Sequence, residues 1–569
     1  MKKMFKNIFL TLAAFTVVST SCIHDLDVIP LNKSDITPET DYGKDAQGYI
    51  QGLSKLYFSF INTKDLKVKD EGASELIRAF WSTQEVTTDA CKCAWSSDEW
   101  VRALNTNTWA SEQNDATYAI YCRTILGISY VNEYLRQTTP AKLAERGVDS
   151  ALAAKVASYR AEARFIRACL YWMAFDTFGN VPFTTEDSPI GGGYLPTQKP
   201  RADVFDFCVN ELKDIINSGD MPAVRSNYPR ADVGSAYGLL ARLYLNAKVY
   251  KGVPMYKEAK ETCEAIFNLG YTLCPDYASL FRGDNGENLE ARNEFLFAIS
   301  YNAEKTQSYG GTGYLTFAAI AKADVKDDKG TSDDASDDVF FAPTGISDGW
   351  GGIRVPYEYV EKYFAPTSVP ELDDKNQYKD NNYVIADKRG HMFNIKGCQE
   401  SMQDALYVFK NGWSCWKYNN IPHDKTIDEY LETSKTKAYS DIDYPMIRLG
   451  EIYLIYAEAC MYEGAASLAL PKLKELADRA GVAAPESITQ EFLVAERARE
   501  LMWEGHRRTD LIRYGLYSGN DYIWPYKGSE GFTGQAFGQY MEIFSIPPTE
   551  LASNGELVQN PQYPTNTAE

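Results

Sequence analysis

Apolar residues recur at steps of three and four along several stretches of the chain, which is the period of a helix with one buried face. The clearest patterns cover residues 152–177, 233–247 and 447–461. Gly179 and Pro182 follow the first pattern, and these residue types commonly terminate a helix. Helix-forming residues also fill 491–515 up to about Gly505. These stretches predict a mostly α-helical protein.

Residues 239–267 predict two helices joined by a turn, which is the arrangement of one tetratricopeptide unit. Small alanines stand where two helices must approach closely, and tyrosines form wedges between them: Ala241, Ala259, Ala265, Tyr244 and Tyr256. The unit does not recur at a fixed spacing near about 34 residues, so insertions would interrupt any array of such units. A generic helical hairpin is the alternative for these residues.

Between about 280 and 443 the helical period is lost, and Gly, Asp, Asn and Tyr become frequent. Residues 324–338 form an acidic low-complexity run that lacks the spacing of an EF-hand, so a solvated loop is expected. We expect irregular loops and short strands in this region, supported by the helices. Functional loops commonly stand on such a rigid frame.

The N-terminal residues have the features of a secretory signal. Three lysines precede an apolar run at 8–18, which is too short to span a bilayer because a spanning helix needs about 20 residues. Small residues lead into Cys22, as in the lipobox of bacterial lipoproteins, although Ser19 stands where Leu is usual. We expect a signal peptide at 1–21 and acylation of Cys22. The alternative is an ordinary signal followed by an unmodified cysteine.

Charge and composition exclude several classes of function. The formal charge is −20, whereas nucleic acids and anionic membrane surfaces require a basic partner. The 44% share of hydrophobic residues excludes a disordered chain. No metal-ligand spacing occurs among the four histidines, His24, His391, His423 and His506, which argues against a zinc enzyme. The ten cysteines besides Cys22 are expected to be mostly small buried side chains.

Segment 78–100 places Trp81, Trp95 and Trp100 close together without helical or strand spacing. The residues between the first two tryptophans include Thr-Thr-Asp at 87–89, which is typical of a loop. Two interpretations are open at this point. Either the loop buries its indoles in a core, or it presents some of them to a ligand.

Five segments match, in order, the motifs of the SusD/RagB family of outer-membrane glycan-binding lipoproteins, which the chain therefore resembles. They are residues 159–183, 239–250, 444–459, 496–515 and 544–563. The resemblance covers essentially the whole mature chain. It implies a helical fold with tetratricopeptide-like repeats that support a variable, loop-rich region. It also implies a binding protein rather than an enzyme.

The resemblance further implies a location and a partner. The protein would be held at the outer membrane by its lipid anchor alone and exposed at the cell surface, where it would deliver oligosaccharides to a SusC-like TonB-dependent transporter. Asp25 and Asp27 resemble the acidic export signal of surface lipoproteins in Bacteroidetes. A single domain is expected at 22–569. Its parts are a scaffold mainly at 40–280 and 444–515, a loop-rich region at about 280–443 and a closing segment at 516–569.

Within the family, segments 78–100 and 309–350 resemble the starch-binding type. That resemblance implies a sugar site formed by Arg78, Trp95, Asp98, Tyr309 and Trp350, with Tyr314 as a substitute for Tyr309. Aromatic faces would stack on successive sugar rings, and the planar guanidinium suits paired hydroxyls. Position 98 is Asn in the starch-binding type, and only Asn can donate a hydrogen bond. The expected ligand is an α-glucan, either starch and maltooligosaccharides or a dextran-like polymer.

Four other tryptophans and three acidic residues are assigned structural roles. Trp81, Trp100, Trp109 and Trp172 are expected in the core. The Asp-x-Asp sequence of Asp441 and Asp443, together with Asp284, offers the oxygen ligands that Ca²⁺ prefers, and the starch-binding type is similar at both places. No cofactor is expected to be required. A bound Ca²⁺ would be structural, and two polar turns without metal are the alternative.

Residues 496–515 concentrate charged side chains that allow a competing hypothesis. A pair of their carboxylates could act as the acid and base of a surface glycoside hydrolase. The acidic residues are Glu496, Glu500, Glu504 and Asp510, which lie close in sequence to Arg507, Arg508 and Arg513. Glu500 and Glu504 are four residues apart. Spacing by four places both on one helical face, with Glu504 also four residues before Arg508, which favours a structural salt-bridge network. The remaining alternatives are a binding protein for a non-glucan polysaccharide and an adhesion module without a small ligand.

Overall fold

The computed structural model describes residues 42–564, apart from 65, 69, 110–112, 322–325, 328–339, 342, 404 and 434–436. The predicted signal peptide at 1–21 and the predicted lipidation site Cys22 lie outside the described residues, as does most of the acidic run at 324–338. Within the part of the chain that is described, no helix is both long and apolar enough to cross a membrane.

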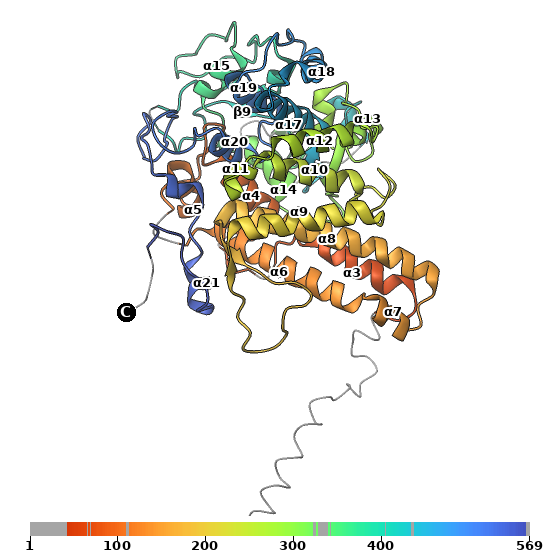
Figure 1. Cartoon of the computed structure of the whole chain (residues 1–569). Coiled ribbons are helices and arrows are strands. Elements are labelled where there is room, and N and C mark those ends of the chain that lie inside the picture. Colours follow the sequence, from red (N-terminus) through yellow and green to blue (C-terminus); the bar gives the residue numbers. More distant parts are fainter. Residues whose placement is uncertain are drawn as a thin grey trace, which may run out of the picture.

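The N-terminal part of the scaffold is a layer of long helices. Its elements are α3 (Ala46–Phe58), η1 (Glu71–Ser74), α4 (Leu76–Glu85), β1 (Lys92–Cys93), α5 (Glu99–Thr106), α6 (Asp115–Gln137), α7 (Pro140–Glu145), α8 (Ser150–Phe178), β2 (Val181–Pro182), β3 (Gln198–Lys199) and α9 (Arg201–Ser218). Helices α3, α6, α8 and α9 lie side by side in Figure 1, and α8 packs against the other three. From Ala161 onwards α8 is buried on almost every side, so neighbouring helices surround its C-terminal half.

A second group of helices continues the scaffold and closes it. It comprises α10 (Val233–Leu245), α11 (Ala247–Lys251), α12 (Tyr256–Phe267), α13 (Leu289–Glu294), α17 (Leu449–Tyr462), η5 (Ala466–Leu468), α18 (Leu470–Ala480), α19 (Gln490–Glu500), α20 (Arg507–Arg513), η6 (Gln539–Glu542) and α21 (Pro548–Ser553). Helix α10 packs on α9 and α12, and α12 packs on α17. Ala241 and Ala259 are fully buried, as the close approach of α10 and α12 requires. The mostly helical, tetratricopeptide-like fold is thus confirmed.

Much of the loop-rich region lies over this scaffold, as Figure 1 shows around α15, whereas α14 is buried and packs on α4. Its elements are η2 (Tyr277–Phe281), β4 (Phe295–Ile299), α14 (Gly311–Ala319), β5 (Lys326–Asp327), β6 (Phe340–Phe341), β7 (Ile353–Arg354), α15 (Tyr357–Phe364), η4 (Lys388–Met392), β8 (Phe393–Asn394), β9 (Ser414–Cys415), α16 (Ile427–Thr433) and β10 (Tyr444–Arg448). The short helices were not predicted, because segments of seven to nine residues are too short to show a clear period. Antiparallel pairing of β4 with β10 connects the region to α17.

The helix predicted from residue 491 to about Gly505 ends five residues earlier than the sequence indicates. Helix α19 stops at Glu500, and both Trp503 and Gly505 have positive φ, at 62° and 76°. Tertiary contacts hold this turn, because the carbonyl of Trp503 accepts hydrogen bonds from the indole of Trp81 and the hydroxyl of Tyr418. The ten cysteines are free thiols, nine of them buried, in agreement with the sequence prediction.

Candidate binding site

Four of the five residues predicted to bind sugar lie together, although they come from separate segments. Trp95 follows β1, Trp350 precedes β7, and their ring centroids are 6.5 Å apart. Tyr309 lies on the other side of Trp350, at 5.5 Å between centroids. The guanidinium carbon of Arg78, on α4, is 5.9 Å from the Trp95 ring. The result is a row of three aromatic side chains with a cation behind it, which we call the aromatic row (Trp95, Trp350 and Tyr309).

Pairing between β1 and β7 sets the distance between the two indoles. Cys93 pairs with Ile353, and the amide of Ala94 donates a hydrogen bond of 2.7 Å to the carbonyl of Gly352. Gly352 has a φ of 104°, and a Cβ at this position would lie 2.3 Å from the indole nitrogen of Trp95. Only glycine therefore allows the Trp95 indole to lie against this turn.

The segment carrying Trp350 is fixed to α14. The amide of Trp350 donates to the carbonyl of Phe317 over 2.9 Å, and the Phe317 ring stacks on the indole at 4.8 Å between centroids. Tyr309 precedes the same helix and is 43% exposed, whereas Trp95 and Trp350 are half-buried. One edge or face of each ring in the aromatic row is therefore accessible to a ligand.

Arg78 is buried, with only 1% of its surface exposed. Its guanidinium forms an ion pair of 2.7 Å with Asp70, donates to the carbonyl of Tyr309 over 3.5 Å, and lies 4.2 Å from the ring of Tyr314. Its Nε has no hydrogen-bond partner among the described residues. In this geometry Arg78 supports the aromatic row from behind. Direct contact with sugar hydroxyls stays a prediction.

Asp98 is the fifth predicted residue and lies at the start of α5. It is half-buried, and the hydroxyl of Ser97 donates to its carboxylate over 3.4 Å. Its side chain does not cap the helix, so the carboxylate is not committed to the α5 backbone. Its role in sugar binding stays a prediction.

Three neighbours of the aromatic row were not predicted from sequence. Tyr439 lies 4.9 Å from Tyr309 between centroids, and Phe317 supports Trp350 as described. Phe409 is 44% exposed, and its ring lies against Gly351, next to Trp350. Phe409 and Tyr439 are single aromatic residues in loops far from Tyr309 and Trp350 in sequence, and such residues give no local signal of their partners.

The other aromatic predictions are settled by burial. Trp81, Trp100, Trp109 and Trp172 are all buried, with at most 7% exposed, which confirms their core assignment. Tyr314 is 1% exposed, so the prediction that it could replace Tyr309 as a surface for sugar stacking is wrong. Its ring lies between Arg78 and the indoles of Trp81 and Trp95. Segment 78–100 thus buries two of its indoles and leaves Trp95 accessible.

A buried carboxylate lies beneath the loop that carries Tyr309. Glu75 is fully buried and accepts hydrogen bonds from the hydroxyls of Tyr301, at 2.5 Å, and Ser308. Burial raises the pKa of Glu75 to about 7, although these hydrogen bonds and the charge of Arg78 act in the opposite direction. Glu75 therefore changes its charge near neutral pH.

We expect Glu75→Gln to alter the pH dependence of stability. The raised pKa means that the folded state holds a proton that the unfolded state loses above about 4.5, so wild-type stability falls as pH rises from there to about 7. The amide of the variant cannot ionise, so the stability of the wild type relative to the variant should fall over the same range. Denaturant unfolding at about pH 5 and about pH 8 measures this difference. A difference independent of pH would contradict the assignment.

The three predicted calcium ligands lie in neighbouring turns with separate partners. Asp441 and Asp443 line a polar cavity of about 430 Å³. Asp441 forms an ion pair of 2.8 Å with Lys437, and Asp443 accepts from the hydroxyl of Tyr228 at 2.6 Å. Asp284 accepts instead from the ring of His423 at 2.6 Å.

Among the described residues, Asp284, His423 and Asp424 form a group whose possible ligand atoms lie within 4.8 Å of one another. Asp441 and Asp443 are not part of that group. Lys437 lines the same cavity as Asp441 and Asp443, whereas Asp284 does not line it. All three aspartates remain predicted ligands.

Comparison with known proteins identifies the family. The model of the SusD family matches residues 293–563. The starch-binding protein SusD of Bacteroides thetaiotaomicron is 30% identical over 576 aligned positions, which cover 96% of each chain. The chain belongs to the SusD family. A SusD-like protein of Bacteroides ovatus is 23% identical over 63% of this chain and 59% of its own length.

Solved structures of SusD-like proteins share the fold. A laminarin-binding SusD-like protein matches 92% of this chain and all of its own, with a TM-score of 0.64 and 18% identity. Surface glycan-binding protein A from Bacteroides thetaiotaomicron, in complex with laminarihexaose, matches 90% of this chain and 98% of its own, with a TM-score of 0.63 and 18% identity. At these identities the likeness shows the SusD fold alone.

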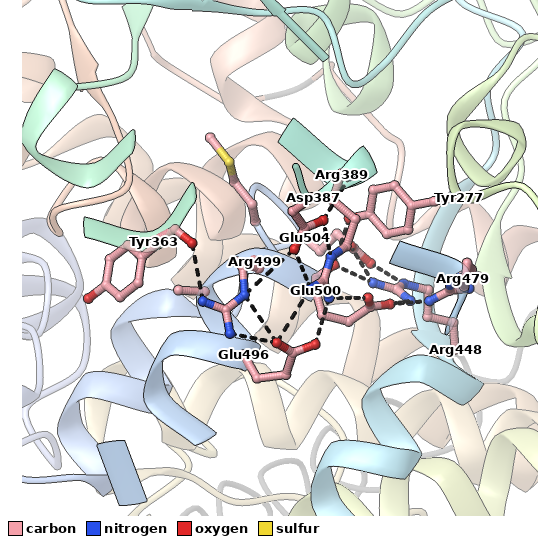
Figure 2. A network of polar contacts seen from close by, with 12 residues as sticks. Tyr277, Tyr363, Asp387, Arg389, Arg448, Arg479, Glu496, Arg499, Glu500 and Glu504 are labelled. Carbon is pink, nitrogen blue, oxygen red and sulfur yellow. Dashed lines mark hydrogen bonds and ion pairs between the residues drawn. The ribbon is translucent and has the colours of Figure 1, made fainter. Parts of the chain in front are cut away.

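The charged block at 496–515 forms a buried network in this SusD-family chain (Figure 2). Glu500 contacts Arg389, Arg448 and Arg479, and no part of it is exposed. Glu504 pairs with Arg448 and Lys417. The predicted Glu504–Arg508 helical pair is not among its ion pairs, because α19 ends before Glu504. Both carboxylates are enclosed by cations, which leaves neither of them open to a substrate.

Proposed function

We propose that this SusD-family protein is a cell-surface lipoprotein that binds an α-glucan and delivers it to a SusC-like TonB-dependent transporter. The acylated Cys22 would attach it to the outer membrane. The ligand would be starch, maltooligosaccharides or a dextran-like polymer.

The observation that carries this proposal is the aromatic row. Sugar rings have apolar C–H faces, so aromatic side chains in a row can each cover one ring of an oligosaccharide. Tyr309, Trp350 and Trp95 succeed one another at centroid distances of 5.5 and 6.5 Å. These rings are held by β1–β7 pairing and by α14, so little conformational entropy is lost when a ligand binds. Asp98, three residues after Trp95 in sequence, would accept a hydrogen bond from a sugar hydroxyl.

An α-linkage is supported by the relative at 30% identity, which is described as a starch-binding protein. The laminarin-binding structures are more distant, at 18% identity. Asp98 can only accept hydrogen bonds when ionised, so this site lacks a donor that an Asn would supply. That difference would alter affinity among α-glucans rather than remove binding.

Affinity electrophoresis through gels that contain one polysaccharide each tests the proposal. We expect retardation by amylopectin, pullulan or dextran, and none by laminarin. Retardation by laminarin alone would contradict the α-glucan assignment. New reducing ends after incubation with any of these polymers would instead favour the glycoside hydrolase hypothesis.

Delivery to a transporter is tested separately, by co-purification of the protein from outer membranes with a SusC-like partner. A Cys22→Ala variant should lose the lipid anchor and leave the membrane fraction. Recovery of that variant in the membrane to the same extent as the wild type would contradict the anchor.

We also propose that Ca²⁺, held by Asp284, Asp441 and Asp443, has a structural role. Asp441 and Asp443 directly precede β10, which leads into the scaffold helix α17, and neither side chain belongs to the aromatic row. Chelator should therefore lower the melting temperature and leave glucan retardation at room temperature largely unchanged. Loss of glucan binding from a chelated but folded protein would contradict this role.

A further inference from the structure

A second cavity, of about 600 Å³, lies between η2, η4 and the segment that follows β9. None of the residues of the aromatic row lines it. Its volume is within the range of about 300–1,000 Å³ found for small-molecule sites. The exposed side chains of Lys388 and His391 stand on its wall, so it opens to solvent there. None of the residues proposed to bind sugar or Ca²⁺ lines this cavity.

The wall of this cavity is unusually basic for a chain with a formal charge of −20. Six basic side chains line it and only one acidic residue, Asp276, does so. The basic residues are Arg282, Lys388, Arg389, His391, Lys417 and Arg479. A surplus of positive charge on a concave wall raises the local concentration of anions.

Three of these cations are already neutralised by the buried network, in which Figure 2 labels Arg389 and Arg479. The network connects five cations with five carboxylates: Arg389, Arg448, Arg479, Arg499 and Lys417 with Glu294, Asp387, Glu496, Glu500 and Glu504. Its charges cancel, so the network itself adds no net charge to the cavity. One donor is nevertheless left over, because the buried Nε of Arg479 has no hydrogen-bond partner in the described part of the chain.

The uncompensated charge belongs to Arg282 and Lys388. Arg282 is half-buried, and its side chain makes no hydrogen bond or ion pair with any described residue. Asp276 does not neutralise it by contact, because its carboxylate accepts from the amide and hydroxyl of Ser279 at 3.0 and 2.7 Å. The donors of a half-buried guanidinium without a protein partner are available to an anion in the cavity.

The rest of the cavity wall includes apolar side chains that can pack against the carbon skeleton of a ligand. Phe281, Phe393 and Trp416 line the cavity, and Trp416 is half-buried. The indole nitrogen of Trp416 donates to the hydroxyl of Ser414 at 3.1 Å, which fixes the ring in place. An apolar wall with a few convergent polar groups is the usual composition of a small-ligand site.

We propose that this cavity binds a small organic anion, with its negative group held by Arg282 and Lys388 and its ring packed against the half-buried side chains of Trp416 and Met392. Either a carboxylate or a phosphate fits this chemistry, since arginine pairs with both through two hydrogen bonds. The site is separate from the aromatic row, so the proposal does not depend on the proposed glucan.

Titration calorimetry with three matched probes tests the proposal: glucose, glucuronate and glucose 6-phosphate. We expect heat from one or both anions and none from glucose at this site. The two anions decide between a carboxylate and a phosphate ligand. Substitution of Trp95 and Trp350 together should leave anion binding unchanged, which distinguishes this site from the aromatic row. No heat from either anion, or equal heat from glucose, would overturn the proposal.

Arg282→Gln should weaken binding of the anion about tenfold or more, since a hydrogen bond to a charged group contributes about 1.5–3 kcal/mol and each 1.4 kcal/mol is about tenfold. Lys257→Gln is the matched control, because Lys257 is 72% exposed on α12 and does not line the cavity. If Arg282→Gln fails to fold, Lys388→Gln removes the other cation from an exposed position. Unchanged affinity in a folded Arg282 variant, or in Lys388→Gln where that replaces it, would overturn the proposal.

Discussion

Replacing Glu500 with Gln should destabilise the protein by about 3–5 kcal/mol, the range measured when one partner of a buried ion pair is removed. Glu500 is fully buried and contacts three guanidinium groups, those of Arg389, Arg448 and Arg479. Their charges hold the pKa of its carboxyl well below its usual value, although burial alone would raise it. The side-chain amide of Gln is uncharged, and its NH₂ group would point hydrogen atoms at the neighbouring guanidinium groups.

The lowered pKa also fixes the sign of the pH dependence. A carboxylate of this kind stabilises the folded state above its unfolded pKa near 4.5, and the contribution is lost as pH falls below that value. The penalty of Glu500→Gln should therefore be full at neutral pH and shrink in acid. Denaturant unfolding of both proteins at several pH values measures it.

Glu475→Gln is the matched control for Glu500. Glu475 is 46% exposed and pairs with Lys472 on one turn of α18, at 2.9 Å. Exposed pairs contribute about 0–1 kcal/mol, so this variant should unfold almost as the wild type does. Equal effects of the two substitutions would show that the buried network does not stabilise the fold. Lost glucan hydrolysis in the Glu500 variant would instead revive the enzyme hypothesis.

The scaffold could be predicted from sequence where one helix carries a long apolar period. Helix α8 spans Ser150–Phe178 against a predicted 152–177, because its period and its terminating Gly179 are both local. The end of α19 could not be predicted, because contacts with Trp81 and Tyr418 determine the conformation at Trp503. Those contacts join segments more than 80 residues apart, as the Trp503–Tyr418 separation of 85 shows.

The sequence predicted which aromatic side chains come together better than it predicted how their neighbours are arranged. A resemblance to the starch-binding type indicated Trp95, Tyr309 and Trp350, and the structure brings these side chains together. The burial of Arg78 could not be predicted, because it depends on contacts with the ring of Tyr314 and the carboxylate of Asp70. The partners of Glu504 were equally hidden, because Arg448 and Lys417 lie on β10 and after β9.

Replacing Trp95 with Ala should weaken glucan binding roughly tenfold or more while the fold remains intact. Stacking on nucleic-acid bases contributes about 1–3 kcal/mol per ring, and the middle of that range, about 2 kcal/mol, corresponds to about thirtyfold in affinity. Trp350→Ala should act in the same way, with some additional loss of stability because its indole also stacks on Phe317. Affinity electrophoresis and thermal unfolding are measured together on each variant.

Trp81→Ala is the control that separates a ligand platform from a core residue. Trp81 is 1% exposed, and its indole donates to the carbonyl of Trp503 at 2.8 Å. Truncation of such a side chain costs about 3–5 kcal/mol of stability, without removing a surface that meets the ligand. Trp95→Ala should thus bind poorly and melt near the wild type, whereas Trp81→Ala should melt much lower. If Trp95→Ala instead melts as low as Trp81→Ala and still binds glucan, then Trp95 is a core residue and the aromatic row is not the sugar site.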